Sequence, residues 1–235
     1  MKIVIVHIPK AAGTSLKEAI SAKVGIDNIH FDYDRPLARG DLSRNARCLA
    51  SSITVKPREE SIIFGHFLVG KYARFNGCYF RRRKKIFYVT FLREPLQRAI
   101  SHFFFWKRTA VQGHRVWERF TQENWSLERF LLSREHTNFQ AKFLWRFPLN
   151  QFDFIGLTEY FHDSVEMLGR VSPLLSGLPI KTENGNPKNS IGASYSIDSC
   201  LASEFMRRNE LDYDLYNQGV KRFLIQKHKL LKAKG

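Results

Sequence analysis

Short apolar runs bounded by polar residues recur along the chain and predict buried β-strands. The runs at residues 3–6, 61–67 and 86–92 are rich in β-branched and aromatic residues, which is typical of strands covered on both faces of a sheet. A further run covers residues 153–158, and a shorter extended piece is expected at residues 29–31. The pattern therefore predicts several strands that lie inside the protein and do not face solvent on one side.

The segments between these runs carry good helix formers or apolar residues at helical spacing. Because strands alternate with helices, we expect an α/β fold with a mostly parallel sheet flanked by helices. No internal repeat or long linker divides the 235 residues, so residues 1–235 are expected to form a single domain. Residues 173–196 predict a long loop. One helix is predicted to follow the first loop and to end at about residue 23, and another is predicted to start at residue 95. Further helices are predicted at residues 41–52, 126–134, 161–171, 197–208 and 213–232.

The link between the first strand and the first helix, HIPKAAGTS (residues 7–15), is the strongest local signal. Gly13 allows a close approach to the backbone, and Thr14 or Ser15 is expected to cap the helix. A tight strand-to-helix turn offers free N–H groups and the positive end of a helix dipole to an anion. The spacing is not that of the Walker loop GxxxxGK[ST], because Lys10 precedes the glycine. An ordinary turn with a solvent-facing lysine is the alternative.

Polar residues follow three of the predicted strands: Lys10 with Thr14, then His66, then Arg93. Ligands of open α/β sheets bind beyond the carboxyl ends of the strands. We therefore expect these side chains to converge at one edge of the sheet and to form a site there.

Charge and cysteine content narrow the possible partners and the compartment. Lys and Arg outnumber Asp and Glu by 38 to 22, and the net charge of +16 favours nucleic acid, an anionic membrane or an acidic polysaccharide as a partner. The three scattered cysteines show neither zinc spacing nor a disulfide framework, which predicts free thiols in a reducing compartment. No apolar run reaches the roughly 18 residues of a membrane span. A cytoplasmic location is expected, or the Golgi lumen if a membrane anchor has been removed.

Two segments together resemble a known enzyme family. HIPKAAGTS resembles the 5′-phosphosulfate loop of sulfotransferases that use 3′-phosphoadenosine 5′-phosphosulfate (PAPS), and is closest to the glycan-modifying, Golgi-type branch. FLREPLQRAISHFF (residues 91–104) resembles the 3′-phosphate motif of that branch. FGHF (residues 64–67) is similar to the segment with the catalytic histidine of uronic-acid 2-O-sulfotransferases. Weaker likenesses cover residues 138–144, 154–159 and 211–216.

The sequence departs from that branch at two points. Uronic-acid enzymes often carry a second histidine two positions before the catalytic one, where this chain has Phe64. Golgi members have an amino-terminal membrane anchor, for which this chain shows no apolar run. A soluble bacterial member of the family would account for both departures.

The resemblance implies PAPS as the donor, 3′-phosphoadenosine 5′-phosphate (PAP) as a product, no metal, and a glycan or glycolipid acceptor, expected to be anionic. It assigns His66 as the base that deprotonates the acceptor hydroxyl and Lys10 as the charge on the departing phosphate. The 5′-phosphate would be held by Lys10, Ala12, Gly13, Thr14 and Ser15, and the 3′-phosphate by Arg93 and Ser101. Apart from the resemblance, we expect Asn189 and Ser190 to close over the nucleotide, and the acceptor to meet Arg98, His102, Lys107, Arg108 and Asn138.

Simpler interpretations stay open for each of these residues. Arg93 could form a surface ion pair with Glu94, His66 could be a structural polar group, and His7 is expected to have a hydrogen-bonded structural role. Residues 103–106 (FFFW) are expected to pack in the core and at its edge and not to stack on a sugar. Two other functions compete: a P-loop kinase or nucleotide hydrolase, and a basic nucleic-acid-binding protein. The sequence leaves the position sulfated and the oligomeric state open.

Overall fold

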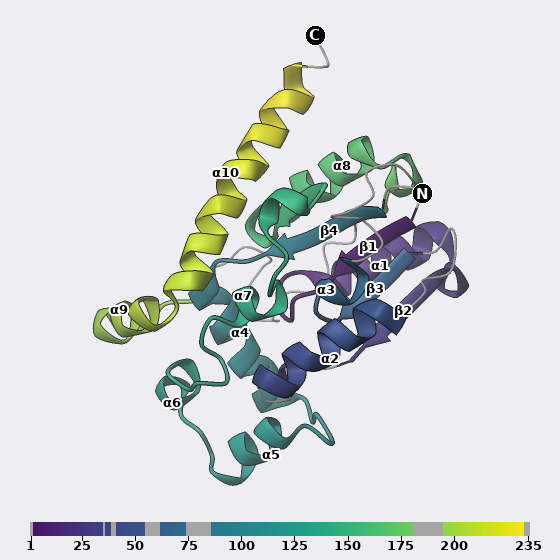
Figure 1. The fold of residues 1–235 in the computed structure, drawn as a ribbon. Helices are drawn as coiled ribbons and strands as arrows, with labels where there is room; N and C mark the ends of the chain where they lie inside the picture. The colour runs from purple at the N-terminus through teal and green to yellow at the C-terminus, as the bar shows by residue number, and fades with distance from the viewer. Residues whose placement is uncertain are drawn as a thin grey trace.

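A five-stranded sheet forms the centre of the computed structural model, which describes residues 2–34, 36–38, 41–54, 62–73, 86–180 and 195–232 (Figure 1). All four neighbouring strand pairs are parallel. The α/β fold with a parallel sheet flanked by helices, predicted from the alternation of elements, is confirmed. In order across the sheet the strands are β2 (Ile29–Tyr33), β3 (Ile62–His66), β1 (Lys2–Val6), β4 (Ile86–Leu92) and β5 (Phe154–Leu157).

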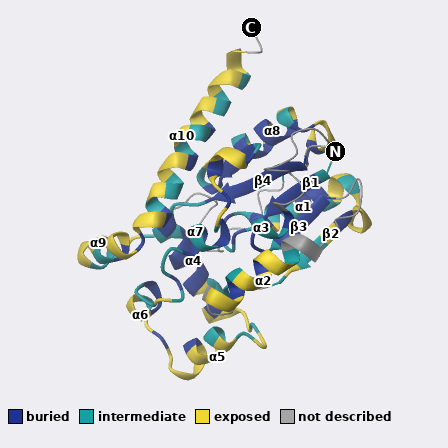
Figure 2. Cartoon of the chain, viewed as in Figure 1, coloured by how far each residue is buried: buried dark blue, intermediate teal, exposed yellow. Residues whose placement is uncertain are grey.

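Burial along the strands follows from their places in the sheet. Every residue of β4 and β5 is buried, and β1 is buried from Ile3 onward because it pairs with β3 on one side and β4 on the other (Figure 2). The edge strand β2 differs, since Ile29 is buried while His30 and Tyr33 are exposed. Strands covered on both faces need continuous apolar sequence, which is the pattern found in β1, β3 and β4.

Helices surround this sheet, and α8 and α10 both contact β5. The long helix α10 runs along one side of the molecule, and α5 and α6 lie at the end opposite to the chain terminus of α10 (Figure 1). No helix in the described ranges is both long and apolar enough to cross a bilayer. The helices are α1 (Gly13–Val24), α2 (Asp41–Thr54), α3 (Gly70–Ala73), α4 (Pro95–Arg108), α5 (Arg115–Gln122), α6 (Leu127–Leu131), α7 (Phe139–Phe143), α8 (Phe161–Val171), α9 (Ser199–Arg208) and α10 (Glu210–Lys232).

Two clusters of buried apolar side chains hold these elements. The larger one contains the sheet together with residues of α1, α7 and α8. The smaller one joins α4, α5, α6 and α9 through Phe103, Trp106, Phe120, Phe130 and Phe205. Two residues separate β4 from α4, and the apolar side chains of α4 belong to the second cluster. Helix α4 therefore connects the carboxyl end of the sheet to helices α5, α6 and α9.

Candidate functional site

The loop between β1 and α1 closes tightly at the carboxyl edge of the sheet. The amide of His7 donates to the carbonyl of Gly65 at 2.8 Å, so the loop begins hydrogen-bonded to β3. Lys10 and Ala12 both have left-handed backbone conformations, with φ of 70° and 57°. Non-glycine residues adopt this region uncommonly, and two of them so close together mark a backbone held by its surroundings.

The start of α1 differs from the prediction. Ala12 is the N-cap, in the left-handed region, and no side chain caps the helix. The expectation that Thr14 or Ser15 caps the helix is wrong, because the helix already begins at Gly13 and both residues lie inside its first turn. Their hydroxyls form no side-chain hydrogen bond within the part of the chain that the structure describes. The first turn therefore keeps its amide groups and two hydroxyls for another partner.

Gly13 is required by the imidazole of His7. A Cβ built on Gly13 would lie only 1.7 Å from His7 Nε2, so no larger residue fits without moving the ring. Burial, followed by the neighbouring charges of His66 and Lys10, lowers the pKa of His7 well below its ordinary value. Its Nδ1 is buried and has no hydrogen-bond partner among the described residues. His7 is hydrogen-bonded as predicted, but through its backbone N–H and C=O and not through its ring. The neutral ring packs between α1 and β3.

His66 stands at the end of β3 with one ring nitrogen fixed. Its Nδ1 lies 2.7 Å from the carbonyl oxygen of His7, and since a carbonyl can only accept, Nδ1 carries the proton. The neutral ring then has Nε2 as its basic nitrogen. The rings of His7 and Tyr33 flank it at centroid distances of 4.3 and 5.0 Å.

Three cations gather where the first loop meets the end of β4. Burial, and then the charges of Arg93 and Arg108, lower the pKa of Lys10 to about 8. The Lys10 ammonium lies 4.4 Å from the centre of the Phe105 ring, and its backbone carbonyl accepts a 3.2 Å hydrogen bond from the Arg93 guanidinium. The two strand-to-helix corners therefore touch, as the convergence expected from the topology requires.

No carboxylate pairs with Lys10 or Arg93 among the residues described here. The predicted alternative, an ion pair between Arg93 and Glu94, is not formed, because the Glu94 carboxylate caps α4 and accepts from the amide of Gln97 at 2.6 Å. Burial also lowers the pKa of Arg93. The charge of Arg93 lowers the pKa of Lys10, and the nearby charges of Glu159 and Glu94 act on Arg93 without forming an ion pair with it. Two partly buried cations without an ion-paired carboxylate among the described residues favour an anion beside them.

The side chain of Gln140, on α7, fixes the backbone of Arg93 with two hydrogen bonds. Its Oε1 accepts from the Arg93 amide at 3.1 Å, and its Nε2 donates to the Arg93 carbonyl at 2.8 Å. Gln140 is fully buried, and its backbone N–H donates to the buried carboxylate of Asp212. The same carboxylate accepts a hydrogen bond from the backbone N–H of Ala141. The junction of α7 and α10 therefore positions the Arg93 corner. This role of Gln140 was not predicted; residues 138–144 and 211–216 carry only a weak family likeness.

A cavity of about 540 Å³ opens beside this charged corner. His66 and Pro9 form part of its wall, and Phe105, under the Lys10 ammonium, is shared by the cavity and the cation cluster. Residues 103–106 were expected to pack in the core and at its edge; Phe103 and Trp106 are buried, and Phe105 and Trp106 also line the cavity.

The residues predicted to meet the acceptor separate into two groups. His102 lines the cavity, and Arg108 lies near enough to Lys10 to lower its pKa. The structure does not support direct contacts from the other three. Arg98 is only 1% exposed, with its guanidinium 4.2 Å from the centre of the Phe139 ring. Lys107 is exposed and donates to Asn124, away from the cavity.

Asn138 is the third of these corrections, and it has a structural role. It precedes α7 in a left-handed conformation, and its Oδ1 accepts from the amide of Asp212 at 3.2 Å. The backbone N–H of Asn138 donates to Oδ1 of Asn209 at 2.7 Å. The Oδ1 and the backbone amide of Asn138 thereby join α7 to the start of α10.

The remaining predicted residues are placed as follows. Ser101 is buried on α4, and its hydroxyl forms no hydrogen bond within the described chain. Asn189, Ser190 and Cys78 lie outside the described residues. Cys48 and Cys200 are free thiols. In the ranges that the structure covers, no three His, Cys, Asp or Glu side chains are grouped so as to hold a metal ion.

Comparisons with known proteins leave the function to be argued from the site. No protein-family model matches the chain, and no curated protein matches it. Among solved structures, the crystal structure of mouse sulfotransferase SULT7A1 complexed with PAP is similar to this chain at 13% sequence identity and a TM-score of 0.37. That likeness covers 92% of this chain and 88% of the mouse chain.

Proposed function

We propose that the protein transfers the sulfuryl group of PAPS to a hydroxyl of an acceptor molecule. One observation carries the proposal: the Lys10 and Arg93 corners touch, carry cations that pair with no carboxylate of the described residues, and adjoin a cavity whose wall contains His66. The same two corners are the segments that resemble the 5′-phosphosulfate loop and the 3′-phosphate motif of PAPS-dependent sulfotransferases.

The donor phosphates would be divided between the two corners. The first turn of α1, with the amides of Gly13, Thr14 and Ser15, would hold the 5′-phosphate at the positive end of the helix. The Arg93 guanidinium would grip the 3′-phosphate, with the Ser101 hydroxyl as a second donor. Gln140 would hold Arg93 in place during binding, since both backbone groups of Arg93 are hydrogen-bonded to it.

In the proposed transfer step, residues at the two corners and at the cavity accept the proton and stabilise the leaving group. A new S–O bond forms to the acceptor oxygen as the bond from sulfur to the 5′-phosphate oxygen breaks, and that oxygen keeps the electron pair. The proton of the acceptor hydroxyl passes to Nε2 of His66, whose Nδ1 proton is held by the His7 carbonyl. Lys10 stabilises the negative charge that develops on the departing phosphate. We infer no role for a metal in this step.

Substitution of His66 tests the base without disturbing the fold. In His66→Asn the side-chain amide can still donate to the His7 carbonyl, but no basic nitrogen remains. With ³⁵S-labelled PAPS and an acceptor panel, we expect transfer to fall by about 10²–10⁴-fold while the Kd for PAP stays unchanged. His162→Asn, on the exposed side of α8, is the matched control. Wild-type turnover in His66→Asn would remove the base assignment.

Ligand selectivity separates the competing functions. Thermal unfolding is followed with PAP, with ATP and Mg²⁺, and with single-stranded DNA, because a ligand that binds the native state raises the apparent stability. Stabilisation by PAP alone is expected. Stabilisation by ATP and Mg²⁺ but not by PAP would favour a kinase or nucleotide hydrolase. Stabilisation by DNA alone would favour a nucleic-acid-binding protein.

A further inference from the structure

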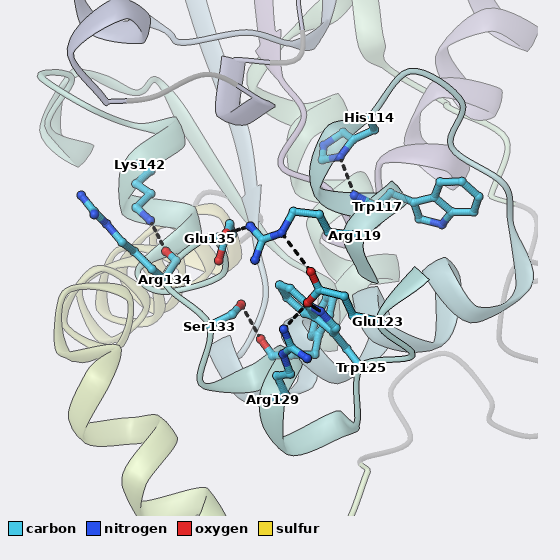
Figure 3. Close-up of polar contacts among 11 residues, drawn as sticks. His114, Trp117, Arg119, Glu123, Trp125, Arg129, Ser133, Arg134, Glu135 and Lys142 are labelled. Atoms are coloured by element: carbon cyan, nitrogen blue, oxygen red, sulfur yellow. Dashed lines mark hydrogen bonds and ion pairs between the residues drawn. The ribbon is translucent and has the colours of Figure 1, made fainter. Parts of the chain in front are cut away.

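The cavity beside His66 lacks the charges that an anionic acceptor would need. Of the described residues that line it, none is Lys or Arg, and Glu135 is the only acid. Glu135 is paired with Arg119 at 3.1 Å, and Figure 3 shows Arg119 between Glu135 and Glu123. A bound anion would therefore meet no cation in the cavity wall and would lie near a carboxylate.

The two most deeply buried imidazoles of the wall, His102 and His136, do not supply positive charge either. Burial lowers the pKa of His102 and of His136 well below the ordinary value, so both rings are neutral at pH 7. His114 uses its Nδ1 to accept a hydrogen bond from the amide of Trp117 at 3.2 Å, and Figure 3 shows this contact at the start of α5. Among the described residues, Lys10, Arg93 and Arg108 lie in the neighbouring corner, whereas the Arg98 guanidinium lies behind the wall, with Nη1 3.4 Å from His102 Nδ1. Arg98 is only 1% exposed, so it offers almost no surface to a ligand in the cavity.

Aromatic side chains from three elements form part of the rest of the wall, together with aliphatic side chains such as Leu37 and Val116. Tyr33 comes from β2, Phe105 and Trp106 from α4, and Phe139 and Phe143 from α7. Aromatic walls bind flat apolar ligands through area burial and offset or edge-to-face ring contacts. A volume of about 540 Å³ is in the range of pockets that enclose a single small molecule.

Resting on the proposed function, we infer that the acceptor is an uncharged, ring-bearing alcohol or phenol that lies in this cavity with its hydroxyl toward His66. The anionic donor and the neutral acceptor are thereby separated by charge: the cations lie in one corner and the aromatic rings in the next, with Phe105 between them. This acceptor class differs from the anionic glycan predicted from the net charge and the family resemblance.

Two ligands with the same ring system and different charge test this inference. 2-Naphthol is uncharged at pH 7, and 2-naphthoate is an anion of similar size. By isothermal titration calorimetry we expect 2-naphthol to bind at least about tenfold more tightly than 2-naphthoate, because only the anion loses solvation without gaining a cation. A sulfate-free uronic-acid disaccharide is the third ligand and is expected to bind more weakly than 2-naphthol. Equal or tighter binding of either anion overturns the inference.

A matched pair of variants locates the binding. Ala110 is exposed at the rim of the cavity, so Ala110→Trp narrows the cavity without disturbing a buried contact. We expect it to weaken 2-naphthol binding about tenfold and to leave the Kd for PAP unchanged. Ser203→Trp, on the exposed face of α9, should change neither. Unaltered 2-naphthol binding in Ala110→Trp would place the ligand elsewhere and contradict the inference.

The same titrations distinguish this inference from the proposed function. If 2-naphthol binds in the cavity but the protein neither binds PAP nor transfers sulfuryl groups, the proposed function fails, and the acceptor assignment fails with it, although the cavity still selects neutral rings. If PAP binds and sulfuryl groups pass to the anionic disaccharide but not to 2-naphthol, only the acceptor class is wrong. Labelled 2-naphthyl sulfate, formed from ³⁵S-PAPS, is the expected product.

Discussion

The charge of Lys10 should make the ligand-free protein less stable. Its pKa of about 8, against 10.5 for an ordinary lysine, corresponds to roughly 3 kcal/mol at ~1.36 kcal/mol per pKa unit. Lys10→Met keeps the length of the side chain and removes the charge. About 1 kcal/mol is lost with the cation–π contact to Phe105, which leaves a net gain of about 2 kcal/mol at pH 7.

Thermal unfolding measures this gain directly. For a chain of 235 residues, about 2 kcal/mol raises the Tm by roughly 4–8 °C. Lys17→Met is the matched control: its ammonium also lies over an aromatic ring, Phe31, at 4.9 Å, and this variant should lose about 1 kcal/mol or less. Lys10→Met should at the same time lose the rise in Tm that PAP gives to the wild-type protein.

The pH dependence gives a second check on the same residue. Between about pH 8 and 10.5 the folded state holds fewer protons at Lys10 than the unfolded state does, so this group makes the free energy of unfolding rise with pH across that window. Below pH 8 Lys10 is charged in both states, so the burial of its charge lowers the free energy of unfolding by the full amount. The rise should be absent in Lys10→Met. A Lys10→Met protein that is less stable than wild type at pH 7 would refute the reasoning that uncompensated charge gathers at this corner.

Three further outcomes follow from the site. Binding of PAP near pH 8 should take up protons, because a phosphate beside Lys10 restores its ammonium form; calorimetry in buffers of different ionisation enthalpy measures this, and no uptake would separate Lys10 from the phosphates. Gly13→Ala should cost about 1–3 kcal/mol by clashing with the His7 ring, and His7→Ser should relieve that cost in the double variant; strictly additive losses would contradict the contact. Gln140→Leu leaves two backbone groups of Arg93 without partners, so PAP affinity should fall while adenosine 5′-phosphate affinity holds; an equal loss for both ligands would indicate general unfolding.

Elements with strong local patterns could be predicted from the sequence. Helix α8 matches its predicted bounds, and β4 is the apolar run that the pattern indicates. Helices α3, α5 and α7 were not predicted. Two of them are only four and five residues long, so local periodicity gives little signal there. Helix α5 does carry apolar residues at helical spacing, Val116, Trp117 and Phe120, and this signal was missed.

The candidate site was predictable only where strand ends supply its residues. Lys10 and Arg93 follow a strand and His66 ends one, so parallel topology alone places them at one edge. The clamp of Gln140 on Arg93 joins positions 47 residues apart, and no spacing rule in the sequence encodes it. Arg98 was expected to meet the acceptor, whereas its side chain is enclosed beside Phe139; charged residues are rarely so buried, and nothing in the local sequence marks this one.

The central claim is that two strand-to-helix corners bind the two phosphates of one nucleotide, and a pair of titrations tests it. PAP and adenosine 5′-phosphate differ only in the 3′-phosphate, which the Arg93 corner would hold. Wild-type protein should bind PAP about 10–100-fold more tightly, since a charge-assisted hydrogen bond contributes about 1.5–3 kcal/mol, and Arg93→Met should remove that preference while leaving the Kd for adenosine 5′-phosphate unchanged. Equal affinity of the wild-type protein for the two nucleotides, or an unaltered preference in Arg93→Met, would contradict the account.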